Sequence, residues 1–167
     1  MNSKTTTDTQ GKGTVAPSRR AVLVLAGAAA TFAAVTGYRL LTRPVYDGGH
    51  LSVEAAHRQA AEGTILLVDI RQPEEWRDTG IPEHARPIDM RRDDFPEALT
   101  AALGADRSRP IALICARGVR SARLSTLLTE AGFNNILDVP AGMLGSAAGP
   151  GWLAKDLPVT PYSETAE

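Results

Sequence analysis

Residues 111–121 read Ile-Ala-Leu-Ile-Cys-Ala-Arg-Gly-Val-Arg-Ser, an apolar run that leads into a basic loop containing one glycine. The apolar run 111–115 predicts a buried strand. Residues 119–131 predict a helix that Gly132 ends. Cys115 is therefore expected at the carboxyl end of a strand, a few residues before a helix begins.

The same alternation of elements extends over residues 50–160. Further helices are predicted at 52–62, 73–77 and 94–103, and further strands at 65–70 and 135–139. Strands separated by helices need crossover connections, which give a parallel sheet with helices on both faces. The predicted fold class is α/β, with one domain because 167 residues suit a single core and an appendage.

The charge is distributed unevenly along the chain. Residues 1–46 hold six basic side chains and one acidic, a net of +5, whereas residues 47–167 hold twelve basic and eighteen acidic, a net of −6. A basic leader before an acidic body is typical of a targeting or membrane segment joined to a soluble domain. The near-neutral total gives no indication of a nucleic-acid partner.

The amino-terminal segment has the features of an export signal or a membrane anchor. Residues 1–17 are polar and expected to be disordered. Ser18-Arg19-Arg20 precedes an uncharged run at 21–38, just long enough to span a bilayer, and resembles a twin-arginine signal. The alternative is a buried Ala-rich helix of the globular domain.

These features predict the following organisation of the chain: a disordered leader at 1–17, a signal or transmembrane anchor at 18–42, a linker at 43–49, the domain at 50–160 and a tail at 161–167. The charge bias around the apolar run keeps the amino terminus cytoplasmic. The domain is then expected on the periplasmic side of a bacterial inner membrane, or free in the periplasm if the leader is cleaved.

Cys115 is the only cysteine, so no internal disulfide can form. At the start of a helix its sulfur would meet unpaired backbone N–H groups and the positive end of the helix dipole. Gly118 allows a turn tight enough for several amides to converge, and Arg117 and Arg120 add positive charge. This setting favours a thiolate, or equally a persulfide anion. The alternative is a cysteine of the core, which is common for this residue type.

Cys115-Ala-Arg-Gly-Val-Arg-Ser121 resembles the active loop of the rhodanese-like sulfurtransferases. Other segments agree with this family in order and spacing over about residues 50–160: Leu67-Val-Asp-Ile-Arg-Gln-Pro-Glu-Glu-Trp76, Gly80-Ile-Pro82 with Ala85, Gly132-Phe133, and Ala141-Gly-Met-Leu144. Phosphatases of related architecture have five residues between Cys and Arg, whereas this loop has four. The chain departs from the family at two places: Glu83-His84 replaces a glycine of the turn, and Ser146 stands where the family has Trp. These departures leave the identity of the substrate open.

The resemblance implies a rhodanese-like three-layer fold and a thiosulfate sulfurtransferase that needs no metal or other cofactor. Cys115 would take the outer sulfur of a donor such as thiosulfate and pass it to a thiophilic acceptor. The implied donor-binding residues are Ala116, Arg117, Gly118, Val119 and Arg120. A noncatalytic membrane-anchored module for docking or sulfide sensing is the alternative function, and a phosphatase or arsenate reductase is disfavoured by the loop size.

The remaining chemically active residues are expected to support the fold. By resemblance, Asp69 and Arg71 form a structural ion pair or brace. His50, His57 and His84 have no metal-ligand spacing and are expected at the surface. Trp76 and Trp152 are predicted packing anchors, and the acidic pairs 74–75 and 93–94 are expected to be first-turn helix charges. No protein partner or oligomeric state follows from the sequence.

Overall fold

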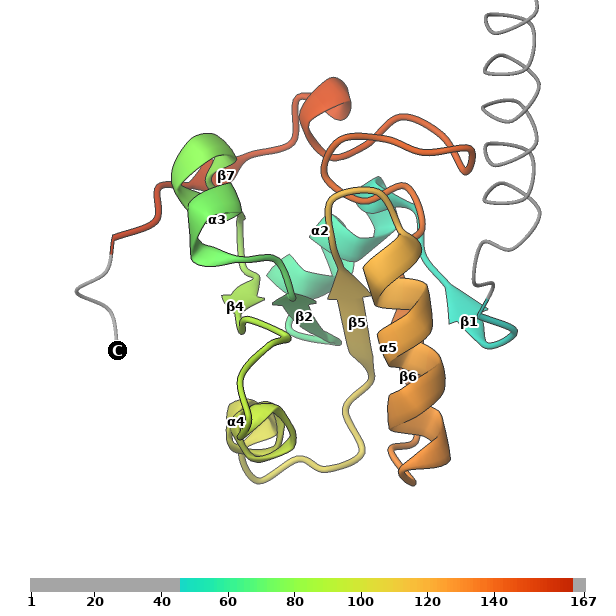
Figure 1. The fold of residues 1–167 in the computed structure, drawn as a ribbon. Coiled ribbons are helices and arrows are strands. Elements are labelled where there is room, and N and C mark those ends of the chain that lie inside the picture. The colour runs from blue at the N-terminus through green and yellow to red at the C-terminus, as the bar shows by residue number, and fades with distance from the viewer. Residues whose placement is uncertain (1–45, 164–167) are drawn as a thin grey trace, which may run out of the picture. The chain divides into compact units, whose positions relative to one another are not determined.

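A single parallel sheet organises residues 46–163, the part of the chain that the structure, a computed structural model, describes. Its five strands have the order β1-β6-β5-β2-β4, and every neighbouring pair is parallel. The strands are β1 (Gly49–His50), β2 (Leu66–Asp69), β4 (Arg86–Pro87), β5 (Ile111–Ile114) and β6 (Ile136–Asp138). Figure 1 shows β5 between β2 and β6, with the loop that follows it at the carboxyl edge of the sheet. The predicted α/β class is confirmed.

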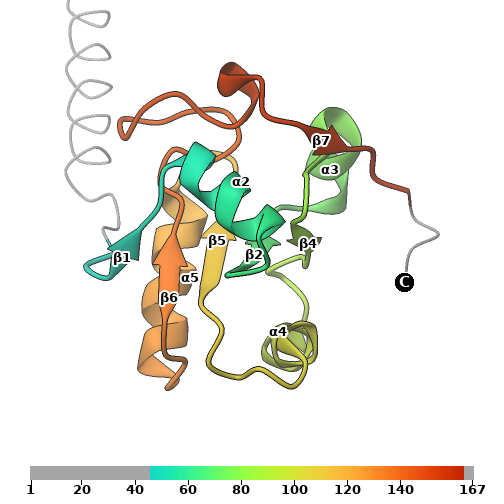
Figure 2. The same cartoon turned by 180° about the vertical axis from the view of Figure 1, so that it is seen from behind.

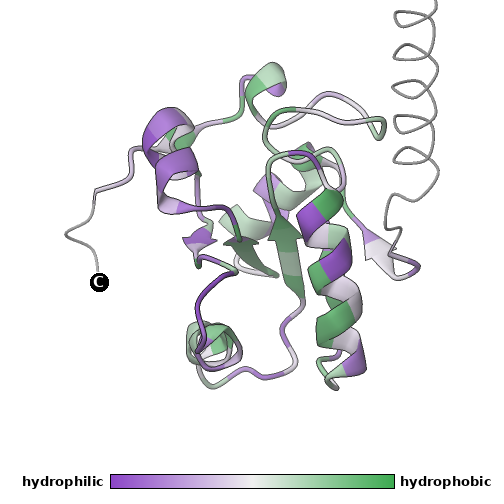
Figure 3. Cartoon of the chain, in the orientation of Figure 1, coloured by the Kyte–Doolittle hydropathy of each residue, from purple (hydrophilic) through white to green (hydrophobic). Residues whose placement is uncertain are grey.

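Helices cover both faces of the sheet, as predicted. α4 (Phe95–Leu103) and α5 (Val119–Glu130) lie on one face, and α2 (Val53–Ala61) lies on the other. Figure 2, from behind, has α2 in front of the sheet and α5 beyond it. Because successive side chains of a strand point to opposite faces, both faces of a buried strand must be apolar. Figure 3 accordingly shows β5 in green, the colour of hydrophobic residues, and the first three residues of β2 are also apolar.

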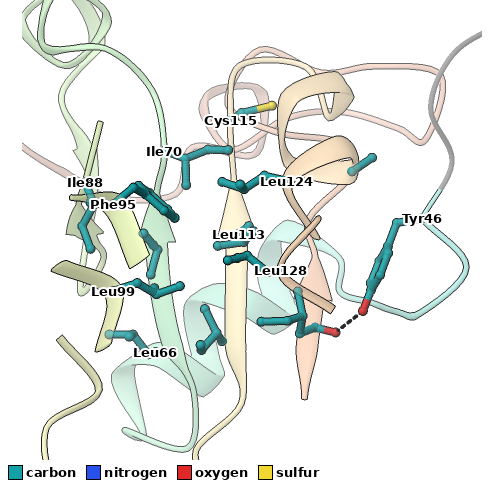
Figure 4. Packing of buried hydrophobic residues seen from close by; sticks show 14 of the residues in the cluster. Tyr46, Leu66, Ile70, Ile88, Phe95, Leu99, Leu113, Cys115, Leu124 and Leu128 are labelled. Carbon is teal, nitrogen blue, oxygen red and sulfur yellow. Dashed lines mark hydrogen bonds between the residues drawn. The ribbon is translucent and has the colours of Figure 1, made fainter. Parts of the chain in front are cut away.

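The core beneath α4 and α5 extends up to Cys115. Phe95 and Leu99 of α4 and Leu124 of α5 pack against the same sheet face, and the cysteine closes the cluster at its upper end (Figure 4). The second core contains Val53 and Ala56 of α2 together with the fully buried Trp152. This arrangement confirms Trp152 as a packing anchor.

The folded domain begins inside the segment 43–49, which was expected to be a linker. Tyr46 is buried, and its hydroxyl donates a 3.0 Å hydrogen bond to the carbonyl of Ile136 (Figure 4). Gly49 already belongs to β1, which pairs with β6. A two-residue strand gives no periodic signal, so only its position beside β6 reveals it.

A small second sheet holds the end of the domain in place. β3 (Ile81–Pro82) pairs antiparallel with β7 (Val159–Thr160), next to α3 (Pro73–Thr79). α3 begins as predicted with proline at its first position, which suits a position whose N–H would be unpaired. A 3-10 turn, η1 (Leu153–Lys155), precedes β7.

The predicted leader at 1–17, the predicted anchor at 18–42 and residues 43–45 of the predicted linker lie outside the described residues. Within 46–163, none of the helices combines the length and apolar character that crossing a bilayer requires. The two-part organisation of the chain therefore stays a prediction.

Candidate active site

Cys115 follows the last residue of β5, at the carboxyl edge of the sheet where parallel α/β folds bind ligands. It is 1% exposed, so its sulfur lies at the bottom of the loop that follows it. Figure 4 shows the sulfur turned towards the start of α5, above Ile70 and Leu124. The predicted strand, loop and helix order around the cysteine is confirmed.

The loop is held from outside by the turn at 141–144. The amide of Met143 donates to the carbonyl of Cys115, and the amide of Leu144 donates to the carbonyl of Ala116, both at 2.9 Å. In a planar trans peptide the C=O and the following N–H point in opposite directions. The amides of Ala116 and Arg117 therefore point away from this turn, towards the other side of the loop. Both are left available for an anion, because neither donates a backbone hydrogen bond within the described residues.

Both the backbone conformation and the surroundings of position 118 require glycine. It caps α5 with φ of +80°, the left-handed region that glycine favours. A Cβ built there would lie 2.1 Å from the carbonyl oxygen of Pro140. The loop thus depends on a backbone approach that no other residue allows.

Gly118→Ala should destabilise the domain more than Gly132→Ala does. Gly132 has a similar φ of +89° but no atom within 4 Å of a built Cβ, so it carries only the conformational cost, about 1–2 kcal/mol. Urea unfolding of both variants measures the difference. Equal losses would mean that Pro140 moves aside and that the contact does not shape the loop.

Two polar side chains of α5 reach the sulfur. The thiol of Cys115 donates to the hydroxyl of Ser121 with an S···O distance of 3.5 Å. The pKa of the Arg120 guanidinium is raised chiefly by its hydrogen bonds to Glu75 and to a smaller extent by the nearby Cys115 sulfur. Arg120 can therefore stabilise negative charge on the sulfur while it stays charged.

Glu75 of α3 clamps Arg120 from across the site. Its two carboxylate oxygens accept hydrogen bonds of 2.6 and 2.7 Å from the two terminal nitrogens of Arg120. These bonds hold the pKa of Glu75 below its usual value of 4.5 despite partial burial. The carboxylate also accepts a 3.1 Å bond from the amide of Gln72, which fixes it to the start of α3. The expectation that Glu75 is only a first-turn charge was incomplete.

Glu75→Gln should lower the rate of sulfur loading by about tenfold to a hundredfold, because a misplaced guanidinium no longer meets the developing charge. The neighbouring Glu74→Gln is the matched control. Glu74 is exposed, and its distances to the guanidinium groups of Arg77 and Arg91 are both 3.9 Å, longer than the distances of the Glu75 clamp. The depressed pKa of Glu75 means that the clamp is present above pH 4.5 and is lost as the pH falls through the lower folded-state value. Stopped-flow rates above pH 4.5 that match in both variants would show that the clamp is dispensable.

Asp69 and Arg71 form the buried brace that the resemblance implied. Arg71 is 1% exposed and its guanidinium donates to the Asp69 carboxylate at 2.7 Å. It also donates to the hydroxyl of Thr79 and the carbonyl of Gly80, both at 2.7 Å. Arg71 thereby fixes the carboxyl end of α3, the helix that carries Glu75.

The other predicted site residues lie at the rim. Arg117 is exposed and its guanidinium donates to the carbonyl of Gly145 at 3.4 Å. Val119 is 40% exposed and Ala116 is half-buried. Their predicted contacts with a donor stay predictions.

The three histidines lie apart from Cys115. His50 and His84 are exposed, as expected, whereas His57 is half-buried and packs edge-on against Trp152 with ring centroids 5.5 Å apart. Among residues 46–163 no group of three or more His, Cys, Asp or Glu side chains could hold a metal ion. The site is therefore built from one thiol, backbone amides and the Arg120–Glu75 pair.

The family follows from a match to the model of the rhodanese-like domain over residues 52–147. The chain belongs to the rhodanese-like domain family. The matched range includes α2, the central strands and the whole cysteine loop. The predicted rhodanese-like fold and family are thus confirmed.

Known proteins of several kinds are similar to this chain. The polysulfide-sulfur transferase of Wolinella succinogenes is 26% identical, with a TM-score of 0.57 over 81% of this chain and 94% of that one. Rv0390 from M. tuberculosis is 26% identical, with a TM-score of 0.56 over 70% and 99% of the two chains. The tRNA uridine(34) hydroxylase of Chlamydia abortus is 30% identical over 65% of this chain. This chain spans about a third of the length of such curated relatives, 35% in that case.

Two site residues besides Glu75 escaped the sequence analysis as functional candidates. Ser121 was recognised only as part of the loop motif, and Asp138 only as part of a strand. Asp138 is nevertheless 1% exposed, and an aspartate within an apolar strand was the one signal that could have drawn attention to it.

Proposed function

We propose that this rhodanese-like domain is a sulfurtransferase that carries sulfane sulfur as a persulfide on Cys115. The observation that carries the proposal is the junction of β5 and α5, where the sole cysteine hydrogen-bonds to Ser121 within a Cys-x4-Arg loop whose Arg120 is clamped by Glu75. The carbonyls of Cys115 and Ala116 accept hydrogen bonds from the turn outside the loop. The loop amides therefore remain available for a negatively charged sulfur.

The proposed reaction has two displacements. The thiolate of Cys115 attacks the terminal sulfur of the donor, a sulfur–sulfur bond of the donor breaks, and the electron pair leaves with sulfite or a shortened polysulfide. A thiophilic acceptor then attacks the outer sulfur of the persulfide, and Cys115 departs as a thiolate. Arg120 offsets the negative charge on the sulfur in both steps.

The burial of Cys115 restricts the donor. A thiol that is 1% exposed is reached only by a small reactant that enters the loop end-on, so the donor sulfur that it attacks must be terminal and unsubstituted. Thiosulfate and polysulfide both have such an atom. The similarity to a polysulfide-sulfur transferase supports polysulfide as a donor, and the family resemblance of the loop supports thiosulfate.

Intact mass spectrometry of the full chain tests the proposal. Incubation with thiosulfate or with polysulfide, in separate arms, should add the mass of one sulfur atom, and cyanide should then release thiocyanate and restore the original mass. Prior alkylation of Cys115 should block the gain. A chain that keeps its original mass in both arms is not a sulfurtransferase.

A binding function is the second candidate, favoured by a cavity of about 530 Å³ beside α3 and β4. Trp76, Pro87 and Tyr162 line it, whereas no residue of the cysteine loop does. Its size is that of a small-molecule site. Cells in which Cys115→Ser fully replaces the wild-type chain would support binding over sulfur transfer.

We further propose that residues 18–42 export the chain or tether it to the inner membrane. The support is the Arg-Arg pair followed by an apolar run. Cell fractionation with an antibody against the domain distinguishes the outcomes. Recovery of the uncleaved chain in the cytosol would contradict both.

A further inference from the structure

A buried carboxyl group lies on the strand next to Cys115. Asp138 ends β6, which pairs with β5 so that Leu113 and Asp138 are opposite each other. Leu113 and Cys115 belong to the core face beneath α5, and so does Ile136, two residues before Asp138. Because strand side chains alternate, Asp138 points to that same face. The carboxyl group and the thiol therefore lie in one layer, covered by the first turns of α5.

Asp138 is incompletely satisfied for a charged group. It is 1% exposed, and its Oδ1 atom has no hydrogen-bond partner among the described residues. Burial raises its pKa, and the opposing effects of Ser121 and His50 are smaller. A buried carboxylate with a free lone pair binds a proton readily.

Ser121 connects the carboxyl group to the sulfur. Its hydroxyl accepts a hydrogen bond from the Cys115 thiol at 3.5 Å and donates one to the carbonyl of Gly118 at 3.2 Å. Burial raises the pKa of Asp138, and the Ser121 hydroxyl opposes that rise. A serine hydroxyl has one proton and two acceptor lone pairs, and it rotates to suit its neighbours. While Cys115 is a thiol, its S–H donates to the hydroxyl, which can turn its own proton from the carbonyl of Gly118 to the carboxylate of Asp138.

The situation reverses when the sulfur becomes an anion. The hydroxyl must then donate to the sulfur, and the carboxylate loses its donor. A protonated Asp138 restores the chain, because it donates to the hydroxyl oxygen. The two arrangements thus differ by the net transfer of one proton from the sulfur to the carboxyl group.

We propose that Asp138 is the base that deprotonates Cys115 through Ser121. The S–H bond breaks as its proton forms an O–H bond at Ser121, and the original hydroxyl proton moves to the Asp138 carboxylate. Total charge is unchanged, since a thiol and a carboxylate become a thiolate and a carboxylic acid. Among the charged groups around the pair, Arg120 faces the sulfur from α5 and His50 faces the carboxylate from β1. The role of this base in turnover rests on the proposed sulfur transfer.

The proposal predicts an unusual pH profile for the reaction of the sole cysteine with iodoacetamide. Because the thiolate arises by an internal shift of one proton, its fraction is independent of pH while the pair holds one proton. The wild-type rate should change less than about twofold per pH unit over part of the range that is scanned, about pH 5 to 8. In Asp138→Asn the rate should instead rise with pH and show no such plateau below its final level, since the thiol then loses its proton to water.

Two serine variants test the connection. Ser121→Ala should remove the plateau as Asp138→Asn does, whereas Ser125→Ala should keep it, because Ser125 is equally buried one turn further along α5. A wild-type profile without a plateau would overturn the proposal, and so would a plateau that persists in Asp138→Asn or in Ser121→Ala. If Asp138→Asn does not fold, the pH profiles of the wild type, Ser121→Ala and Ser125→Ala decide whether the proton transfer through Ser121 takes place. Alkylation needs no sulfur donor, so a plateau in a chain that never loads sulfur would refute the proposed function and leave the base in place.

Discussion

Cys115→Ser should abolish sulfur loading, with a loss of at least about a thousandfold in rate. A serine hydroxyl is not ionised at neutral pH and cannot form the sulfur–sulfur bond that holds the transferred atom. The substitution is close to isosteric, and the side chain at this position is 1% exposed, so the fold should persist with little change. Thiocyanate release and intact mass measure the loss.

The single cysteine makes this experiment unambiguous, because no other thiol in the chain can accept sulfur. Circular dichroism and urea unfolding check that Cys115→Ser remains folded. A folded serine variant that still releases thiocyanate from thiosulfate would show that another group transfers the sulfur.

Arg71→Met should lower the free energy of unfolding by about 3–5 kcal/mol. The substitution leaves the carboxylate of Asp69 buried and uncompensated, and removal of one partner of a buried ion pair carries a cost of this size. It also removes the bonds to Thr79 and Gly80 that hold α3. Urea denaturation monitored by Trp fluorescence reports the change, since Trp76 and Trp152 are both buried.

Arg123→Met is the matched control, because Arg123 is exposed on α5 and such surface changes usually stay within about 0.5 kcal/mol. The double variant Asp69→Leu with Arg71→Met should recover part of the loss, since it removes the stranded charge. A single Arg71→Met variant as stable as the control would mean that water solvates Asp69 and that the brace is unnecessary.

The regular elements were predictable wherever a local pattern marked them. Ser52 caps α2 by accepting a bond from the amide of Ala55, as its position before the helix predicted. β4 gave no such signal, because Arg86 and Pro87 form only two residues and proline is expected in a strand mainly at a sheet edge. β3 and β7 were equally invisible, since their pairing joins residues far apart in the sequence.

The candidate site divides in the same way. The apolar run, the glycine and the two arginines around Cys115 lie within eleven residues, so the sequence by itself determined the strand, the turn and which residue is the proposed nucleophile. Only the tertiary structure decided that Arg120 meets Glu75 and that Asp138 lies in the layer of the sulfur. The physical reason is that a charged side chain looks the same in sequence whether water or another charge surrounds it, and the packing of α3, α5 and β6 around one strand end determines which applies.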